Sequence, residues 1–440
     1  MLAYRSTLAI SVVTWALSSG LTIAELRSGD RIAKESKNLG DWCKFLEDKP
    51  GELYDNNDNP YIQNFQVFGR FHWQYADIDG EGSFKNQTRG FNYNTTEIRR
   101  FRFGARLKFL NCLEAKVRVN FSNDLKPIGG SRHIEYANIY TATLGIDFKE
   151  IFGLDAVDEF DLSLGKERVS PTSEGDISSR YIKTVERTSL HNYISTPSLT
   201  GLSLSSEWGQ WNLALGVYSG DEDREISSFD NGYFYTLHAG YKFKDPKFMD
   251  KSRVDLRVFM NGDEEKNSSR YPSSRGAFNQ KWVVSLSAKS KKGMFSLLTD
   301  LIYGDNGIDY DYTTSGRPIS GNPDREGAFW GVIILPSYWL IEDRLEAVFR
   351  YQYVTASRKE GYRISSRYSR IAGEVYNYTG PNDLSNGRGD RHHSAYLGLN
   401  CYLCGDNAKI MTGIEYDELK SGNQDVYSGT TIWTAFRIYF

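Results

Sequence analysis

The chain has 440 residues, with 53 Lys and Arg against 56 Asp and Glu and a formal net charge of −3. Its mean hydropathy of −0.52 excludes a bundle of membrane-spanning helices, each of which needs about 20 apolar residues. Charged residues make up 25%, an ordinary value for a folded protein, and their balance argues against disorder and against a nucleic-acid partner. Aromatic residues reach 14%, beside 40 Gly and only 11 Pro, and this composition favours an all-β fold.

The first 24 residues have the features of a signal peptide. Arg5 precedes an apolar stretch at residues 8–17 that is too short to span a bilayer, and the small residues Thr22 and Ala24 suit a cleavage site after residue 24. A buried N-terminal helix is the alternative. We therefore predict an exported chain whose polar residues 25–60, with one helical pattern at residues 39–46, precede the main domain.

Four cysteines are too few for a disulfide framework. They are Cys43, Cys112, Cys401 and Cys404. A local Cys401–Cys404 bridge and unpaired thiols both remain open. A zinc site would need two further ligands that neither neighbourhood supplies, so we predict no metal and no cofactor.

From residue 63 onward, apolar and polar residues alternate with a period of two. In residues 98–110, for example, Phe101 and Phe103 lie on the face opposite Arg100 and Arg102. This pattern predicts strands with one apolar and one wet face. The predicted strands cover residues 63–75, 98–110, 113–121, 134–148, 160–167, 199–208, 211–217, 233–243, 254–260, 282–289, 295–303, 329–334, 345–353, 395–402, 408–417 and 432–440.

Connections alternate between short turns and long polar segments, as in outer-membrane barrels. The long segments are residues 77–96, 219–231, 262–277, 304–327 and 357–391. The last strand ends on Phe440, and a strand that runs to the final residue can close a barrel and leave no edge unpaired. We predict that residues 61–440 form a transmembrane antiparallel β-barrel of about 16 strands, in the outer membrane of a Gram-negative-type bacterium. A soluble β-sandwich is the alternative.

If the apolar faces contact lipid, the polar faces line the lumen, where basic residues outnumber acidic ones. Rows of Arg and Lys in a confined pore raise the local concentration of anions. The alternative is that they pair with lumen acids and only keep the channel wet. The candidate pore-lining basic residues are Arg70, Arg100, Arg102, Arg106, Lys108, Arg118, Arg350 and Arg437. Further basic residues that the alternation places on the lumen face are Lys116, Lys242, Arg253, Arg257, Lys281, Lys289 and Lys409. The lumen acids are Glu114, Asp161, Glu167, Asp255, Asp300, Glu346, Glu415 and Asp417.

Residues 166–188 follow a strand but do not alternate, so they suit a loop that folds into the barrel and narrows the pore. A plain surface loop would have a similar composition. The candidate constriction residues are Lys166, Arg168, Arg180, Lys183 and Arg187.

Several segments together resemble the phosphate-selective porin O/P family. They are FGRFHWQYADIDG, EIRRFRFGARLKF, the run from LGKERV to ERTSL, LEAVFRYQYV, LGLNCYL and the closing FRIYF, in this order. The resemblance covers most of residues 63–440 and implies a homotrimeric 16-stranded barrel that passes anions through an arginine-lined channel. By motif it implies lumen arginines at Arg100, Arg102 and Arg106, and a constriction near Lys166, Arg168 and Arg187. Phe440 resembles the C-terminal signal read by the barrel-assembly machinery, and residues 25–60 would lie in the periplasm.

The sequence therefore predicts a passive channel for small anionic solutes, phosphate among them, and no enzyme. No HExxH, GxSxG or P-loop motif occurs, and only Ser394 beside His393 hints at a barrel phospholipase. A general porin of weak selectivity is the first alternative. A surface adhesin is the second, since an Arg-Gly-Asp triplet lies at residues 388–390.

Overall fold

The computed structural model describes residues 40–84, 87–121, 134–221, 223, 225–229, 232–244, 248–267, 278–313, 315, 317–367 and 387–440. The predicted signal peptide at residues 1–24 lies outside the described residues. None of the helices in the described part of the chain has the length and apolarity that a membrane-spanning helix needs.

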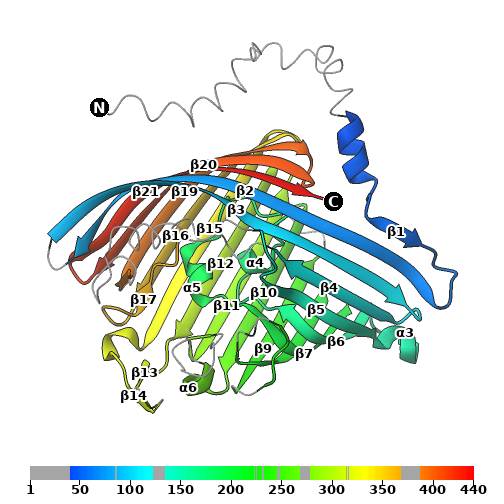
Figure 1. The fold of residues 1–440 in the computed structure, drawn as a ribbon, viewed down its shortest axis with the longest axis horizontal. Coiled ribbons are helices and arrows are strands. Elements are labelled where there is room, and N and C mark those ends of the chain that lie inside the picture. Colours follow the sequence, from blue (N-terminus) through cyan, green and yellow to red (C-terminus); the bar gives the residue numbers. More distant parts are fainter. Residues whose placement is uncertain are drawn as a thin grey trace, which may run out of the picture.

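Sixteen strands form one closed antiparallel barrel (Figure 1), which confirms the predicted fold. Consecutive strands pair with each other, and the last pairs with the first of the barrel, so the ring has no open edge. The barrel strands are β2 (Ile62–Phe84), β3 (Gln87–Phe109), β4 (Leu113–Asn120), β5 (Asn138–Asp147), β6 (Glu159–Arg168), β7 (Ser198–Trp208), β8 (Trp211–Ser219), β9 (Tyr233–Phe243), β10 (Lys251–Asn261), β11 (Trp282–Lys292), β12 (Phe295–Asp305), β15 (Ala328–Ile341), β16 (Leu345–Ala356), β19 (Arg391–Cys404), β20 (Ala408–Ser421) and β21 (Gln424–Tyr439).

Short helices and strands accompany the sixteen barrel strands. A helix at residues 40–47 precedes it, and the remaining elements lie between barrel strands or beside them. They are β1 (Glu52–Asp55), α3 (Phe148–Phe152), α4 (Ser173–Asp176), α5 (Ser189–Ile194), α6 (Glu264–Asn267), β13 (Tyr310–Tyr312), β14 (Pro318–Ser320), η2 (Pro323–Arg325), β17 (Tyr362–Arg363) and β18 (Arg388–Gly389).

The two faces of the wall differ as the alternation predicts. Large apolar side chains such as Leu215, Leu301 and Leu397 are exposed on the outer face. Their polar neighbours in the sequence turn inward, where Asp300 and Glu346 are fully buried. A wall with an apolar outside and a polar inside is the arrangement expected of a barrel in lipid.

One predicted loop is wrong. Residues 77–96 were expected to form a long polar loop, but they continue β2 and β3 as a hairpin in regular register as far as Phe84 and Gln87. Each of these strands has 23 residues, whereas about 9–11 suffice to cross a membrane. Backbone pairing between two long strands stabilises this projecting hairpin although its sequence lacks apolar alternation.

The cysteine prediction also needs correction. Cys404 forms a disulfide with Cys43, 361 residues earlier, while Cys112 and Cys401 are free thiols. The bridge attaches the helix at residues 40–47 to the end of β19, where Leu46 packs against Cys404 and Ala408. The sequence left a Cys401–Cys404 bridge open, but the two residues are three positions apart on β19: Cys401 is exposed, whereas Cys404 is buried against the helix that supplies Cys43.

The N-terminal extension spans the seam where the barrel closes. Its strand β1 pairs with residues 64–66 of β2, and the backbone N–H of Val67 donates to the carbonyl of Gly51 at 2.7 Å. The final strand pairs with β2 only from Arg70 onward, so β1 covers the part of the β2 edge that β21 leaves open. With the disulfide on β19, the extension holds both sides of the closing seam (Figure 1).

Candidate functional site

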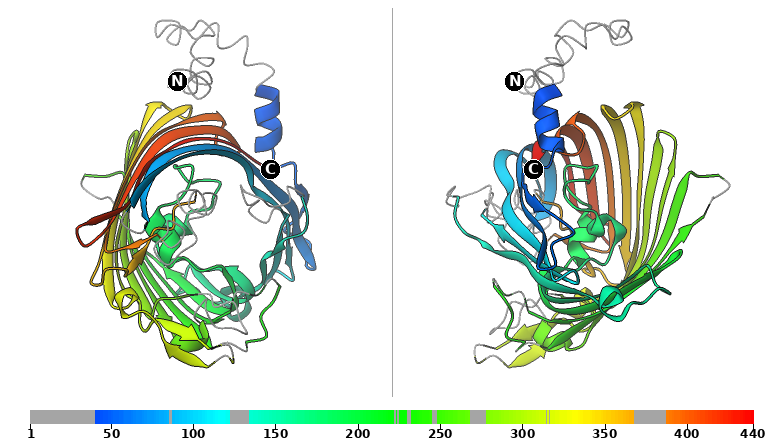
Figure 2. Two further views of the ribbon diagram at one scale, coloured as in Figure 1. Left: turned by 60° about the vertical axis from the view of Figure 1, so that its left-hand side comes forward. Right: turned by 90° about the vertical axis from the view of Figure 1, so that its right-hand side faces the viewer.

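Residues 169–197, between β6 and β7, fold into the barrel and will be called the in-folded segment. Figure 2 shows its helices α4 and α5 inside the ring of strands. Each helix begins at a threonine whose side chain accepts a backbone hydrogen bond, at Thr172 for α4 and Thr188 for α5. The carboxylate of Asp300 on β12 accepts from the N–H groups of Ser173 and Glu174, both at 3.1 Å. The helices of the segment are therefore capped by the segment's own threonines, and Asp300 attaches the segment to the barrel wall.

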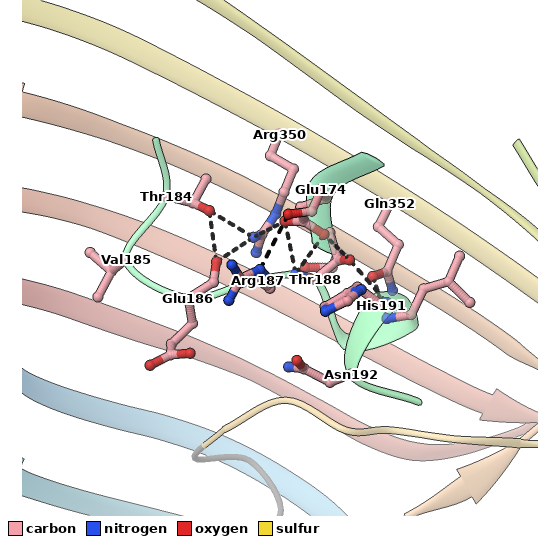
Figure 3. Close-up of polar contacts among 12 residues, drawn as sticks. Glu174, Thr184, Val185, Glu186, Arg187, Thr188, His191, Asn192, Arg350 and Gln352 are labelled. Carbon is pink, nitrogen blue, oxygen red and sulfur yellow. Dashed lines mark hydrogen bonds and ion pairs between the residues drawn. The ribbon is translucent and has the colours of Figure 1, made fainter. Parts of the chain in front are cut away.

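Arg350 on β16 is the central attachment of the in-folded segment (Figure 3). Its guanidinium donates to the carbonyl of Glu186 at 2.7 Å and to the hydroxyl of Thr184 at 3.2 Å. It also pairs with Glu415 of β20 at 2.5 Å and lies 3.6 Å from Glu174. Because Arg350 is only 1% exposed, these contacts replace its hydration, and it acts as an anchor inside the lumen.

The carboxylate of Glu174 completes this cluster. It accepts from the backbone N–H and from the hydroxyl of Thr188, the latter at 2.6 Å. Burial raises the pKa of Glu174, although Arg350 and the Thr188 hydrogen bond favour the charged form. The carboxylate thus joins α4 to the start of α5.

Other basic side chains from the wall bind the backbone of the in-folded segment. Arg437 donates to the carbonyls of Val185 and Ser179, at 2.5 and 3.3 Å, and Lys409 donates to the carbonyl of Ile182 at 3.2 Å. Both are fully buried. These two residues face inward, as alternation predicts, and both hold the segment, while Lys409 also pairs with Asp406 at 2.9 Å.

Side chains of the segment reach the wall in turn. Lys183 pairs with Glu346 on β16 at 2.5 Å, and Asp176 pairs with Arg257 on β10. Arg180 donates to the side chain of Asn407, in the turn after β19. The attachments recorded here therefore lie largely on β10, β12, β16 and β19–β21.

Glu186 holds the segment against β2 and β3. Its carboxylate accepts from Arg99 at 2.6 Å and from Gln74 at 2.9 Å. Burial alone would raise the pKa of Glu186, but the guanidinium groups of Arg99 and Arg100 lower it below its usual range. Glu186 is therefore a charged, paired carboxylate, and the sequence did not single out Arg99 as its partner.

Arg99 reaches Glu186 because of a β-bulge. The register between β2 and β3 pairs His72 with Arg100 and Trp73 with Ile98, so Arg99 is the extra residue on β3. Strict alternation would place Arg99 on the lipid side. Two consecutive arginines between the outward-facing Ile98 and Phe101 are the sequence signal for this change of phase.

The inner face of β2–β4 carries four arginines that we name the arginine wall: Arg70, Arg102, Arg106 and Arg118. The register sets Arg70 directly opposite Arg102 on the neighbouring strand, and Arg106 directly opposite Lys116. Like charges at facing positions destabilise a sheet. Among the described residues, no carboxylate lies within ion-pair distance of Arg70, Arg106 or Arg118, so the wall concentrates positive charge.

Aromatic rings support the arginine wall. The guanidinium of Arg102 lies 3.5 Å from the centre of the Tyr140 ring, and that of Arg118 lies 5.7 Å from it. Arg70 lies 5.4 Å from the Tyr439 ring. Stacking on a ring engages the face of a guanidinium rather than its N–H edge. The Nη1 of Arg70 uses part of that edge to donate to the Ser179 hydroxyl at 2.7 Å. A β-bulge after Ile139 explains why Tyr140 comes to this face, which the sequence did not reveal.

The remaining predicted site residues lie as follows. Arg100 is buried and contacts the ring nitrogen of His72 at 3.3 Å. Lys108 faces Glu114 across the β3–β4 pair, near the rim of short turns. Arg187 donates to the carbonyl of Ile177 at 2.5 Å, and burial together with Arg168 lowers its pKa to about 9. Arg168 donates to the carbonyl of Gly175, so both arginines lie at the in-folded segment.

Lys166 departs from the expectation that it lies near a constriction. The register places it in one row with Ala142, Val117 and Ala105, which belong to the apolar outer face. Its ammonium donates to the carbonyl of Glu225 at 2.8 Å, in the loop between β8 and β9. Arg168, two residues further along at the end of β6, contacts the in-folded segment.

Within the described ranges, no group of three or more His, Cys, Asp or Glu side chains is placed to hold a metal ion. The geometry instead offers a basic wall beside a segment that is attached mostly to β10, β12, β16 and β19–β21, and that also contacts the wall where Arg70 donates to the hydroxyl of Ser179 at 2.7 Å.

The model of the family described as phosphate-selective porin O and P matches residues 65–277, which confirms the resemblance found in the sequence. The range includes the arginine wall and the in-folded segment. No curated protein matches the chain.

Solved structures share the fold at low identity. OmpT, an outer membrane protein of Vibrio cholerae, is 12% identical, with a TM-score of 0.52 over 86% of this chain and 97% of that chain. The anion-selective porin from Comamonas acidovorans is 12% identical, with a TM-score of 0.51 over 86% and 99%. The outer membrane channel DcaP of Acinetobacter baumannii is 10% identical, with a TM-score of 0.50 over 88% and 99%.

Proposed function

Because the chain is an outer-membrane channel with a porin fold, matching the phosphate-selective porin O and P family over residues 65–277, we propose that it conducts small anions, phosphate among them, by passive diffusion. The arginine wall is the observation that carries this proposal. Four guanidinium groups on adjacent strands raise the local concentration of anions in a confined pore. Their N–H edges match the oxygens of phosphate and carboxylate in a bidentate manner.

The in-folded segment narrows the path in this proposal. Its anchors Arg350 and Arg437 hold it to β16 and β21. The solute then passes between the segment and the arginine wall. Arg168 and Arg187, at the segment, add positive charge on the second side of the path.

A general porin of weak selectivity would need the lumen charges to cancel. Many do: Arg253 pairs with Asp255 at 2.7 Å, and Arg350 with Glu415. These pairs lie away from the arginine wall, on β10, β16 and β20. The distribution of charge, rather than its sum, therefore favours anion preference.

The adhesin alternative gains no support from the Arg-Gly-Asp triplet. Gly389 is buried and pairs with Tyr362 in the small β17–β18 sheet, and Arg388 donates to the carbonyl of Glu360 at 3.2 Å. An adhesive triplet needs to be presented at an exposed loop tip. The backbone of this one is part of a packed hairpin.

Phosphate should inhibit the chloride current of the purified wild-type channel, because phosphate and chloride compete for the same guanidinium edges. The measurement is the chloride conductance in a planar bilayer with rising inorganic phosphate at constant ionic strength. Potassium fluoride at the same ionic strength is the control for screening, because fluoride cannot bind a guanidinium edge in a bidentate manner. A chloride current indifferent to phosphate would point instead to a general porin.

We propose further that three copies assemble. The outer face of β3–β6 has a hollow of about 410 Å³ lined by small and apolar side chains, such as Ala105, Ala115, Ala142 and Leu144, which suits packing against a second wall.

In this proposal residues 1–24 are removed on export, residues 25–60 lie at the periplasmic rim, and Phe440 is read by the assembly machinery. Outer membranes should give a trimer band on unheated gels, and less of it without Phe440; a monomer band in both would contradict this.

A further inference from the structure

A cavity of about 530 Å³ lies apart from the arginine wall, between the in-folded segment and the short-turn ends of β9–β12 and β15. Its volume is in the range of small-molecule sites. The function proposed above does not use it. Part of its lining is apolar and part is basic.

The sheet register divides the floor of this cavity into a basic half and an apolar half. One row of directly paired inward residues runs across five strands from Lys242 through Arg253 and Lys289 to Leu298 and Leu335. The next row begins with Lys251 and Lys291 and continues with Ser296 and Ser337. Basic side chains thus come from β9–β11, and leucines and serines from β12 and β15.

The in-folded segment covers the apolar half. Ile177 packs against Leu298 and Leu335, and Ile182 also lines the cavity. A hydrocarbon or aromatic group bound there would be transferred from water into an apolar environment, which is favourable. The hydroxyl of Ser337 already accepts from Lys183 at 2.6 Å, so the polar edge of this half is ordered.

The basic half keeps a positive excess. Lys242 is paired with Glu207 and Arg253 with Asp255. In contrast, Lys251, Lys289 and Lys291 form no ion pair with a described residue. The acids that line the cavity are occupied elsewhere: Glu174 accepts from Thr188, and Asp250 accepts from the N–H of Gly293 at 2.6 Å.

We infer that this cavity binds an amphipathic organic anion, one acidic group on an apolar or aromatic body. The acidic group lies against Lys289 and its basic neighbours, and the body lies against Leu298, Leu335 and Ile177. The inference rests on the proposed anion channel, because it names a class of anionic solute that binds in the lumen during its passage through the channel. Inorganic phosphate lacks the apolar body and belongs to the arginine wall.

The test measures binding at equilibrium, without current, so that it can fail independently of the proposed function. The probe is 4-fluorobenzenesulfonate, and its ¹⁹F line width is titrated with the detergent-purified full chain, with and without inorganic phosphate. The variants are Leu298→Asn in the apolar half and Lys289→Gln in the basic half. Lys281→Gln is the matched control, because Lys281 lies before the same strand at the opposite rim and pairs with Glu264.

We expect the wild type to bind the probe, phosphate not to displace it, and each of the two variants to weaken binding by about tenfold or more. The control should bind as the wild type does. Unchanged affinity in Lys289→Gln and Leu298→Asn, equal losses in the control, or full displacement by phosphate would each overturn the inference. If Leu298→Asn does not assemble, Lys289→Gln alone decides. If the probe binds as expected but the channel proves unselective, the proposed function fails and the cavity assignment stands.

Discussion

Replacing Arg350 with methionine should raise the single-channel conductance, because the in-folded segment loses its central attachment. Methionine keeps much of the side-chain volume but donates no hydrogen bond to Glu186 or Thr184. It also leaves Glu415 and Glu174 buried without their cation. Removing one partner of a buried ion pair costs about 3–5 kcal/mol, which is enough to favour a displaced segment.

The measurement combines conductance in planar bilayers with hydrogen exchange of residues 169–197. We expect a larger conductance and faster exchange of the backbone amides in α4 and α5. Arg253→Met is the control, since Arg253 is also a lumen arginine paired with a buried acid but has no contact with the segment among those described. If Arg350→Met keeps the wild-type conductance and exchange, Arg350 does not hold the segment in place.

Replacing Arg102, Arg106 and Arg118 together with alanine should reduce anion preference. A unit charge about 10 Å from a permeating ion contributes roughly 0.4 kcal/mol in water, which is about a twofold change in local concentration. Three such charges therefore change the local anion concentration by roughly eightfold and, because cations are depleted by the same factor, the anion-to-cation ratio by roughly 64-fold before salt screening lowers the effect. The stacking partners Tyr140 and Phe68 remain, so the wall keeps its shape.

A second triple variant controls for net charge. Lys266→Ala, Lys281→Ala and Arg325→Ala remove the same charge from the long-loop side, where each residue is paired with an acid. This variant should keep the wild-type selectivity and the phosphate inhibition. Equal effects of the two triple variants would show that total charge, and not the arginine wall, sets selectivity.

The alternation of apolar and polar residues was enough to predict the barrel strands and the faces of most of their side chains. In a barrel, period two determines the face almost alone, because lipid and lumen impose opposite polarity on every strand. The same rule failed at Arg99 and Tyr140, where β-bulges shift the phase by one residue. It also could not foresee the hairpin at residues 77–96, whose pairing depends on backbone hydrogen bonds rather than on an apolar face.

The candidate site was predicted less completely, because alternation shows on which face of the barrel wall a residue lies but not which residue it contacts. Arg350 and Arg437 have the same phase as the residues of the arginine wall, yet they anchor the in-folded segment. Which arginine anchors and which faces the path depends on where that segment lies in three dimensions. The Cys43–Cys404 bridge follows the same logic, because the two residues meet only when the barrel closes.

The reversal potential in asymmetric potassium chloride tests the central claim, that the arginine wall makes the channel anion-preferring. The wild-type protein should give a potential of the sign that marks chloride as the more permeant ion. In the Arg102→Ala, Arg106→Ala, Arg118→Ala variant the potential should move toward the potassium side, and in the control triple variant it should stay at the wild-type value. A wild-type potential near zero, or one that the arginine variant leaves unchanged, would contradict the account.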